Sequence, residues 1–370
     1  MNFNNIFLKS FRIVLLPLAI IYGAIVIIRN WLFDKKYIKS ATFNFPLICV
    51  GNIAVGGTGK SPMVEYLIEL LHPQFNVATL SRGYKRKTTG YALADANTTA
   101  LDIGDEPMQF HSKFPEIAVA VGEERIEAIP QLLHDKPDLE VIILDDAFQH
   151  RTVNAGLNIL LTEFSNLYTH DFFLPTGDLR DEWASAKRSQ IIVVTKCPVD
   201  LSIEKKEKIT EDLKPLPNQP IFFTTIDYGK PYHIYHLTNK IISQKDEVLL
   251  VCGIANPQPI KDYLLEKAYT YYQKNYSDHH IFTIDDLQEI KDKFDEIDTV
   301  NKLIITTEKD AVRLTKFTEQ LKNLPLYVLP IKHQFLFNQS EQYNALVVNF
   351  INGYKQKKYE QEQENEDKNA

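Results

Sequence analysis

A glycine-rich segment directly after a hydrophobic run constrains the fold of this chain more than any other feature. The run "FPLICV" (45–50) is typical of a buried strand, and "GNIAVGGTGKSP" (51–62) follows it. A standard phosphate-binding loop reads G-x-x-x-x-G-K-[ST], and Ala54 stands here where its first glycine would be. The glycines that remain still let backbone N–H groups face phosphate oxygens at the start of a helix. The segment therefore predicts a phosphate loop in which Gly56 and Gly57 supply the bend.

The loop also carries two side chains with defined chemistry. Lys60 can reach the β- and γ-phosphates of a nucleotide, and the Ser61 hydroxyl can ligate Mg²⁺. The alternative is a glycine-rich turn without a ligand, which a lysine–serine pair at a helix start disfavours. The expected nucleotide-binding residues are Gly56, Gly57, Thr58, Gly59, Lys60 and Ser61.

Hydrophobic runs alternate with polar, helix-like stretches along most of the chain. The runs are rich in β-branched residues and do not alternate strictly, which is typical of parallel strands covered on both faces. Strands separated by helices predict an α/β fold with a doubly wound sheet of the P-loop NTPase type. The proline-rich break "LKPLPNQP" divides a core lobe (41–220) from a β-strand hinge and a smaller α/β lobe (221–354). The polar segment 355–370 is expected to be disordered.

The N-terminal segment 1–40 contains an uncharged run of sixteen residues, "IVLLPLAIIYGAIVII" (13–28). A simple spanning helix needs about 20 apolar residues, so the run is short for one. Basic residues flank it, and Trp31 beside them suits a membrane interface. We expect a membrane-associated helix that spans the bilayer or lies in its interface; a buried helix of the globular fold is the alternative. More positive charge follows the run than precedes it, which predicts that the body of the protein is cytoplasmic.

Two acidic clusters stand out beyond the loop. The segment "VIILDD" ends in Asp145 and Asp146, the position at which a Walker-B aspartate holds Mg²⁺. The segment "GDEP" contains Asp105 and Glu106 before a proline, where a helix could begin. Either cluster could merely cap a helix. A kinase, however, needs one carboxylate that accepts the proton of the acceptor hydroxyl and others that bind metal, and two clusters supply both.

Charged loop residues indicate further site positions. Arg82, Arg125 and Arg180 lie in loops, and ligands of open α/β sheets bind at the carboxyl ends of strands. The segment "YSDHHIF" contains His279 and His280, one of which could pair with a carboxylate; a surface loop is the alternative. The net charge of −7 argues against a nucleic-acid binder. The three cysteines lack metal-ligand spacing and are expected to be reduced core residues.

Ten segments taken together resemble the tetraacyldisaccharide 4′-kinases, the lipid A 4′-kinase family. They occur in the family's order within residues 50–314, and an apolar anchor precedes them, as in that family. Any one segment is weak evidence, whereas ten in order are specific. The segments are "VGNIAVGGTGKSP", "LSRGYKRK", "GDEP", "VGEERIEA", "LDDAFQH", "LPTGDLRD", "VTKCP", "CGIANP", "SDHH" and "TTEKDAVRL".

The resemblance implies a two-lobed kinase that transfers the γ-phosphoryl group of ATP, with Mg²⁺, to the 4′-hydroxyl of tetraacyldisaccharide 1-phosphate, giving lipid IVA. This acceptor is an anionic glycolipid, which would explain an apolar leader on a soluble body. The resemblance implies Asp105 as the base and His279, rather than His280, as its partner from the other lobe. The other implied catalytic residues are Lys60, Arg125 and Arg180; the implied metal ligands are Ser61, Glu106, Asp145 and Asp146; and the implied substrate-binding residues are Arg82, Tyr84, Gln149 and His150.

Three other functions compete with this one. A membrane-tethered GTPase switch should carry [NT]KxD after a strand, but "VVTKCPVD" has Pro198 in place of the aspartate. A scaffold with a degenerate nucleotide site is disfavoured because every catalytic component is present. A kinase for another small-molecule or lipid acceptor would differ only in its substrate. We expect a monomer that uses ATP and Mg²⁺ and works at the surface of the inner membrane.

Overall fold

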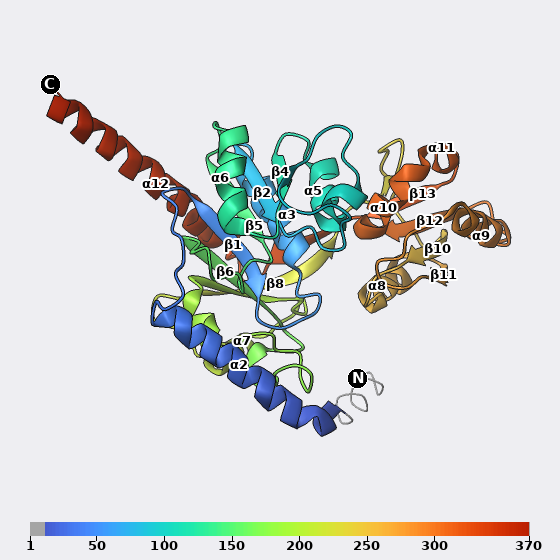
Figure 1. The fold of residues 1–370 in the computed structure, drawn as a ribbon. Coiled ribbons are helices and arrows are strands. Elements are labelled where there is room, and N and C mark those ends of the chain that lie inside the picture. The colour runs from blue at the N-terminus through green and yellow to red at the C-terminus, as the bar shows by residue number, and fades with distance from the viewer. Residues whose placement is uncertain (1–11, 370) are drawn as a thin grey trace.

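The structure is a computed structural model that describes residues 12–369, folded into a larger and a smaller lobe (Figure 1). Nine strands form the sheet of the larger lobe: β1 (Leu47–Asn52), β2 (Val77–Ser81), β3 (Ala92–Leu93), β4 (Ala118–Val121), β5 (Val141–Asp145), β6 (Leu157–Glu163), β7 (Ile191–Thr195), β8 (Ile221–Tyr228) and β14 (Ile331–Phe335). Their order is β14-β8-β7-β6-β1-β5-β2-β4-β3. Neighbours from β8 to β4 pair in parallel, and the edge strands β14 and β3 pair antiparallel. This largely parallel sheet confirms the predicted α/β fold class.

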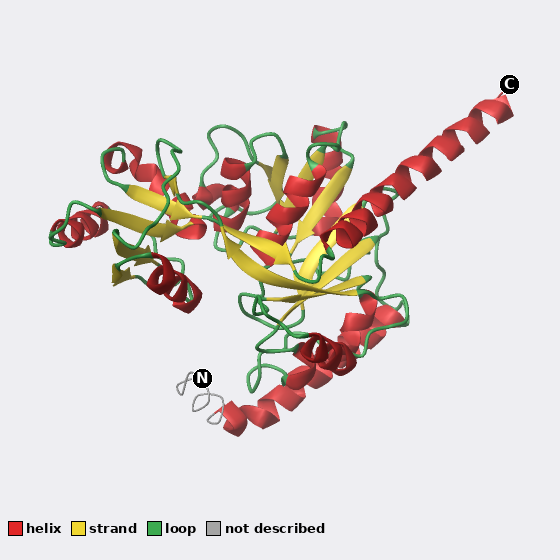
Figure 2. Cartoon of the chain, turned by 180° about the vertical axis from the view of Figure 1, so that it is seen from behind, coloured by secondary structure: helices red, strands yellow, loops and turns green. Residues whose placement is uncertain are grey.

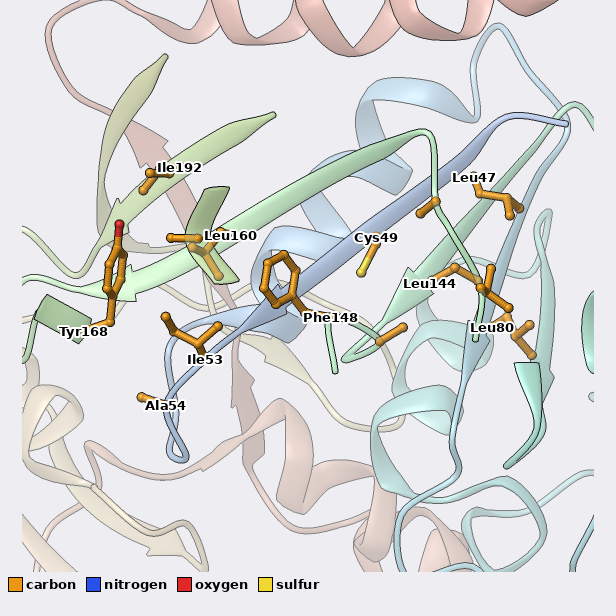
Figure 3. Close-up of a cluster of buried hydrophobic side chains, with 14 of the residues drawn as sticks. Leu47, Cys49, Ile53, Ala54, Leu80, Leu144, Phe148, Leu160, Tyr168 and Ile192 are labelled. Carbon is orange, nitrogen blue, oxygen red and sulfur yellow. The ribbon is translucent and has the colours of Figure 1, made fainter. Parts of the chain in front are cut away.

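Helices cover both faces of this sheet, and the alternation of side chains along β1 divides the core accordingly. The helices are α3 (Lys60–Leu71), α4 (Ala100–Ile103), α5 (Asp105–Lys113), α6 (Arg125–Asp135), α7 (Ile203–Leu213) and α12 (Ser340–Asn369), with the 3₁₀ turns η2 (Tyr168–His170) and η3 (Trp183–Arg188). Ile48 and Val50 belong to a cluster with apolar residues of α3, α5 and α12. Leu47 and Cys49 belong to a second cluster, with residues of α6 and α7. Figure 3 shows part of the second cluster, in which Phe148 packs beside β1.

The smaller lobe has a five-stranded sheet of its own. Its strands are β9 (Tyr232–His233), β10 (Glu247–Cys252), β11 (Thr270–Asn275), β12 (Lys302–Thr307) and β13 (Leu326–Leu329), in the order β11-β10-β12-β13-β9. Its helices are α8 (Gln258–Lys267), α9 (Ile284–Asp295), α10 (Glu308–Leu314) and α11 (Thr318–Leu321), with the 3₁₀ turn η4 (Thr315–Phe317). Strands β10 to β13 are parallel, so their carboxyl ends lie at one edge. Across both lobes the cysteines Cys49, Cys197 and Cys252 are free and buried, as expected.

The connections between the lobes correct the expected boundary at residue 221. Strand β8 pairs in parallel with β7 and so extends the larger sheet. Strand β14 comes back from the smaller lobe and pairs antiparallel with β8. The smaller lobe therefore lies between these two strands, in residues 229–330, and residues 331–354 belong to the larger lobe. The proline-rich segment that was expected to separate the lobes instead links α7 to β8.

The polar C-terminal segment, expected to be disordered, is helical and continues α12 to Asn369. Glutamate, glutamine and lysine are good helix formers, and Gln356 donates a hydrogen bond to Glu360 one turn later (3.0 Å). A shortage of apolar residues prevents burial but not helix formation. The end of α12 accordingly runs away from the body (Figures 1 and 2).

The N-terminal helix α2 (Leu16–Asp34) follows the 3₁₀ turn η1 (Ile13–Leu15) and lies along the outside of the larger lobe (Figures 1 and 2). By length and composition, Ile13–Asp34 is long and apolar enough to cross a membrane. One face of the helix is buried against the body, through the stripe Ala19, Gly23, Val26, Asn30 and Phe33. A Cβ at Gly23 would lie only 2.6 Å from the Phe173 ring, so helix and body touch closely. The opposite face exposes large aliphatic side chains.

Polar contacts connect α2 to the loop at 171–182. The Tyr22 hydroxyl donates to the main-chain carbonyl of Arg180 (3.1 Å), and Asn30 Nδ2 donates to Asp181 Oδ1 (2.7 Å). Both Asn30 and Asp181 are buried. Because a buried polar group is costly without a partner, these bonds fix how the helix sits on the loop.

Candidate active site

The phosphate loop connects β1 to α3 at the carboxyl edge of the larger sheet. Gly56 and Gly59 have φ angles of 115° and 83°, a conformation that other residues rarely adopt. Ala54, at the position of the missing glycine, forms a β-bridge with Leu179. The chain at Ala54 is therefore extended and does not need a glycine. The left-handed residues are Gly56 and Gly59, whereas the sequence had indicated Gly56 and Gly57 for the bend.

Charged side chains from three segments meet beside this loop. Lys60 Nζ lies 3.3 Å from Asn52 Oδ1 and 3.7 Å from Asp146 Oδ1. The Arg180 guanidinium donates hydrogen bonds to both Asp146 and Asn52. The loop lysine thus shares one cluster with two of the residues that the sequence indicated for the site.

The electrostatics of this cluster separate its two aspartates. Burial raises the pKa of Asp145 to about 6, and the negative charge of Asp146 adds to the rise. Burial acts on Asp146 in the same direction, but Lys60 and Arg180 outweigh it and hold the pKa of Asp146 below its usual value. Burial lowers the pKa of Lys60, while Asp146 opposes that shift. The site therefore contains one readily ionised carboxylate and one whose charge has no adequate partner.

The oxygen donors near the loop suit Mg²⁺, which binds carboxylate and hydroxyl oxygens. A cation beside Asp145 would relieve the repulsion that raises its pKa. Ser61, in the first turn of α3, adds a hydroxyl, and Glu106 adds a second acid from α5. Among residues 12–369, no group of three or more His, Cys, Asp and Glu side chains is arranged to hold a metal by itself. Phosphate oxygens would have to complete the shell of such an ion.

A second cluster joins the two lobes at the start of α5. Asp105 Oδ2 lies 2.9 Å from His279 Nδ1 and 2.9 Å from Arg313 Nε. His280 instead contacts Asp286 (2.9 Å). The structure therefore pairs Asp105 with the histidine that the family resemblance indicates.

The acids of this second cluster are held in their ionised form. Burial alone would raise the pKa of Asp105, but hydrogen bonds from Arg313 and His279 outweigh it, so the pKa is below the usual value. Glu106 behaves alike: burial would raise its pKa, but Lys309, with Nζ 2.8 Å from Oε1, lowers it. An ionised carboxylate can only accept hydrogen bonds. His279 Nδ1 therefore carries the proton that it shares with Asp105.

The two clusters lie within electrostatic reach of each other. The charge of Glu106 contributes to the raised pKa of Asp145, and the charge of Lys309 contributes to the lowered pKa of Lys60. The groups come from the carboxyl ends of parallel strands and the helices that follow them, where open α/β sheets bind their ligands. The acids of both clusters thus share one site with the loop lysine.

Three other residues indicated by the sequence support the backbone around the site. Arg125 is buried and donates to the Gly122 carbonyl (2.6 Å). Gln149 donates to the Asn52 carbonyl (2.6 Å), and His150 Nε2 accepts from the Arg125 N–H (3.3 Å). Burial lowers the pKa of both Arg125 and His150. The structure does not bring these side chains into contact with Lys60 or Asp105.

Two further indicated residues are exposed, and one of them contacts the second cluster. Tyr84 is 62% exposed, and its ring meets the His279 ring edge-on with centroids 5.8 Å apart. Arg82, two residues earlier in the same loop, is exposed as well. Both are placed where a large acceptor could reach them.

Four site residues escaped the sequence reasoning: Asn52, Lys309, Arg313 and His333. Asn52 lies within the quoted phosphate-loop segment, and Lys309 and Arg313 lie within "TTEKDAVRL". The family-like segments therefore contained these residues, but the sequence did not indicate what they do. His333 in β14 had none. Its Nε2 donates to the Gly59 carbonyl (2.9 Å), and its Nδ1 accepts from the Thr224 hydroxyl (3.0 Å).

Comparison with known proteins shows the family of this chain. A family model described as tetraacyldisaccharide-1-P 4′-kinase (LpxK) matches residues 11–352. The tetraacyldisaccharide 4′-kinase of Flavobacterium johnsoniae is 47% identical over 345 residues, covering 92% of this chain and 97% of that protein. The enzyme of the same name from Bacteroides thetaiotaomicron is 44% identical over 354 residues, covering 91% and 92%. A crystal structure of LpxK from Aquifex aeolicus in complex with ATP shares 26% identity and a TM-score of 0.72, covering 92% of this chain and 99% of that one. The fold, the phosphate loop and these matches together show that the chain belongs to the tetraacyldisaccharide 4′-kinase family.

Proposed function

We propose that this chain transfers the γ-phosphoryl group of ATP to the 4′-hydroxyl of tetraacyldisaccharide 1-phosphate, the reaction for which its relatives are named. One observation carries the proposal: Lys60, the Asp146–Arg180 pair and the Asp105–His279 pair converge on one edge of the sheet. Phosphoryl transfer needs positive charge at the transferred group and a group that receives the acceptor's proton, and these residues supply both.

The nucleotide binds at the phosphate loop. Backbone N–H groups of residues 56–61 and the N-terminus of α3 hold the phosphate oxygens. Lys60 and Arg180 stabilise the negative charge that spreads over the transferred group. Ser61 and Asp145 would hold Mg²⁺, and Asp146 and Glu106 are the further acids that could bind it. When bound, Mg²⁺ neutralises phosphate charge and orients the triphosphate.

Asp105 acts as the base. The 4′-hydroxyl oxygen bonds to the γ-phosphorus, the bond from that phosphorus to the β–γ bridging oxygen breaks, and the hydroxyl proton passes to Asp105. ADP carries away the electron pair of the broken bond. His279 donates from Nδ1 to Asp105 Oδ2, which orients the carboxylate and stabilises its ionised form.

The exposed loop residues and the remaining indicated side chains serve the glycolipid. Tyr84 packs against His279 on the solvent side, and Arg82 is exposed two residues earlier, so both can contact an anionic sugar. Gln149, His150 and Arg125 shape the backbone around the acceptor and phosphate groups. A single chain contributes every group named here, which supports action as a monomer.

We infer that the N-terminal helix holds the enzyme at the inner membrane, on its cytoplasmic face. One face of α2 packs against the larger lobe along its length. The opposite, aliphatic face is therefore free to contact the acyl chains of the bilayer. Ile21, Ile25 and Ile28 are each more than half exposed on that outer face. We infer an interfacial helix rather than a simple span, and a substrate that the enzyme takes directly from the bilayer.

The test of the reaction uses the full-length chain in detergent micelles with ATP, Mg²⁺ and purified tetraacyldisaccharide 1-phosphate. The expected product is the acceptor plus one phosphate, with one ADP formed per product, measured by mass spectrometry. Asp105→Asn should lose turnover by on the order of 100-fold or more while retaining ATP binding. Equal losses of turnover and ATP affinity would refute the base role, and no product with the wild-type chain would refute the reaction.

The test of the membrane location is flotation with vesicles that contain anionic lipid. The triple variant Ile21→Glu, Ile25→Glu, Ile28→Glu should lose vesicle binding because it places charges on the outer face of α2. The buried stripe is unchanged, so the helix should stay docked on the body. Val300→Glu, which changes an exposed aliphatic residue of the smaller lobe, is the matched control and should bind as the wild type does. Unchanged flotation of the triple variant would contradict the interfacial placement.

A further inference from the structure

Two of the family-like segments, "CGIANP" and "TTEKDAVRL", supply no group to the reaction as described. In the structure they meet at Asp310, which is fully buried. Asp310 Oδ2 accepts hydrogen bonds from the Gly253 N–H (3.0 Å) and from the Thr307 hydroxyl (2.8 Å). A Cβ at Gly253 would lie 3.0 Å from Asp310 Oδ1, so the glycine permits this close approach. The ends of β10 and β12 thus fix one carboxylate in a single orientation.

Arg313, one helical turn after Asp310, links this fixed carboxylate to the base Asp105, because its guanidinium contacts both aspartates. Its Nη1 donates to Asp310 Oδ1 (3.1 Å), while its Nε and Nη2 lie 2.9 Å and 2.8 Å from Asp105 Oδ2. The side chain is almost completely buried. A guanidinium is a planar fork, so bonds to two carboxylates fix its position more strictly than one ammonium could.

The same guanidinium also limits the position of His279. Nη2 lies 3.2 Å from His279 Nδ1. Because Nδ1 already donates its proton to Asp105, Arg313 stands beside the imidazole rather than donating to it. Among the described residues, the contacts that fix Asp105 all use Oδ2. Oδ1 remains for the acceptor's proton.

We propose that Arg313 is a positioning residue for phosphoryl transfer: anchored by Asp310, it orients Asp105 and His279 from the smaller lobe. The inference rests on the proposed function, because it gives Arg313 a role only through the base. On this proposal, the base on the larger lobe is competent only when the smaller lobe is in place, because His279 and Arg313 come from that lobe. Asp105, His279 and Arg313 then form one unit assembled across the lobes.

The experiment measures kcat and the KM for ATP in the glycolipid assay for the wild type, Arg313→Gln, Arg313→Lys, Asp105→Asn and the double variant Asp105→Asn/Arg313→Gln. Arg313→Gln should lower kcat by on the order of 100-fold, the effect of a misplaced reacting group, and leave the KM for ATP within about twofold. Arg313→Lys, which keeps the charge but not the fork, should fall between. Lys332→Gln, which removes a surface pair with Glu69, is the matched charge-loss control and should retain wild-type turnover.

The double variant separates positioning from a general structural effect. If Arg313 acts through Asp105, its loss should cost less than about threefold in the Asp105→Asn background, because groups that act as a unit are not additive. A 100-fold loss in both backgrounds, a change in KM alone, or unchanged kcat would overturn the inference. Should Arg313→Gln not fold, Arg313→Lys is used in the same cycle. Absence of wild-type turnover contradicts the proposed function instead, so the two failures are distinguishable.

Discussion

The buried charge of Asp145 allows the electrostatics of the site to be tested without substrate. Burial, together with Asp146, raises the pKa of Asp145 from 3.8 to about 6, so the folded state favours its protonated form. One pH unit of difference between folded and unfolded pKa corresponds to about 1.4 kcal/mol. Ionised Asp145 therefore destabilises the ligand-free fold by up to about 3 kcal/mol. This penalty is absent well below pH 4 and is complete above about pH 6.

Asp145→Asn removes that penalty while keeping an oxygen that can accept from the Ser81 hydroxyl, which lies 3.3 Å from Asp145 Oδ2. We expect the variant to be more stable than the wild type by up to about 3 kcal/mol at pH 8, and by about half as much at pH 5. We expect it also to lose kinase activity, because the carboxylate that we propose as a Mg²⁺ ligand is gone. The measurement is urea unfolding with a chelator present at both pH values.

Asp146→Asn provides the matched control for this experiment. Lys60 and Arg180 hold the pKa of Asp146 below its usual value, so its charge stabilises the fold above the unfolded pKa. The control should therefore be less stable than the wild type at pH 8. If Asp145→Asn brought no gain at pH 8, or the same gain at pH 5 as at pH 8, the reasoning on the buried charge would be refuted.

Three other predictions concern the loop and the N-terminal helix. Ala54→Gly should lower the free energy of unfolding by about 0.5–1 kcal/mol without lowering the KM for ATP, since Ala54 is extended; a gain in ATP affinity would contradict this. Gly23→Leu should cost about 1–3 kcal/mol in urea unfolding through its clash with Phe173, and resistance to proteolysis after α2 should fall with it. His333→Phe leaves the Gly59 carbonyl without its donor and should raise the KM for ATP. Because burial lowers the pKa of His333 to about 4, the size of that effect should be the same at pH 6 and pH 9.

The central strands of the larger sheet could be predicted because they are buried on both faces. Val141–Asp145 and Ile191–Thr195 are buried throughout and consist mostly of aliphatic residues. The position of strand β14 (Ile331–Phe335) at the edge of the larger sheet could not be predicted. Its residues alternate between buried and exposed, and it pairs with β8, about a hundred residues earlier in the chain. Local patterns do not contain such a pairing, and the lobe boundary was misplaced for this reason.

The site divides in the same way. The phosphate loop and the strand-end position of Asp145 could be predicted from the sequence because each depends on residues that are close together in the chain. The Asp105–His279 pair joins residues 174 positions apart, and only the family resemblance indicated it. Arg125 shows the limit of the strand-end argument. It lies in the first turn of α6 rather than in a loop, and its side chain faces a backbone carbonyl.

The attachment of α2 has a practical consequence for preparing the protein. Tyr22 and Asn30 bond to Arg180 and Asp181, the loop that supplies the guanidinium beside Asp146. A shortened version that starts after residue 40, made to avoid detergent, would lack the hydrogen bonds from α2 that hold this loop. It would also expose the apolar surface around Phe173 that Gly23 now covers. Weak turnover by such a fragment could then come from a displaced Arg180 beside the phosphate loop, and not only from the loss of membrane binding.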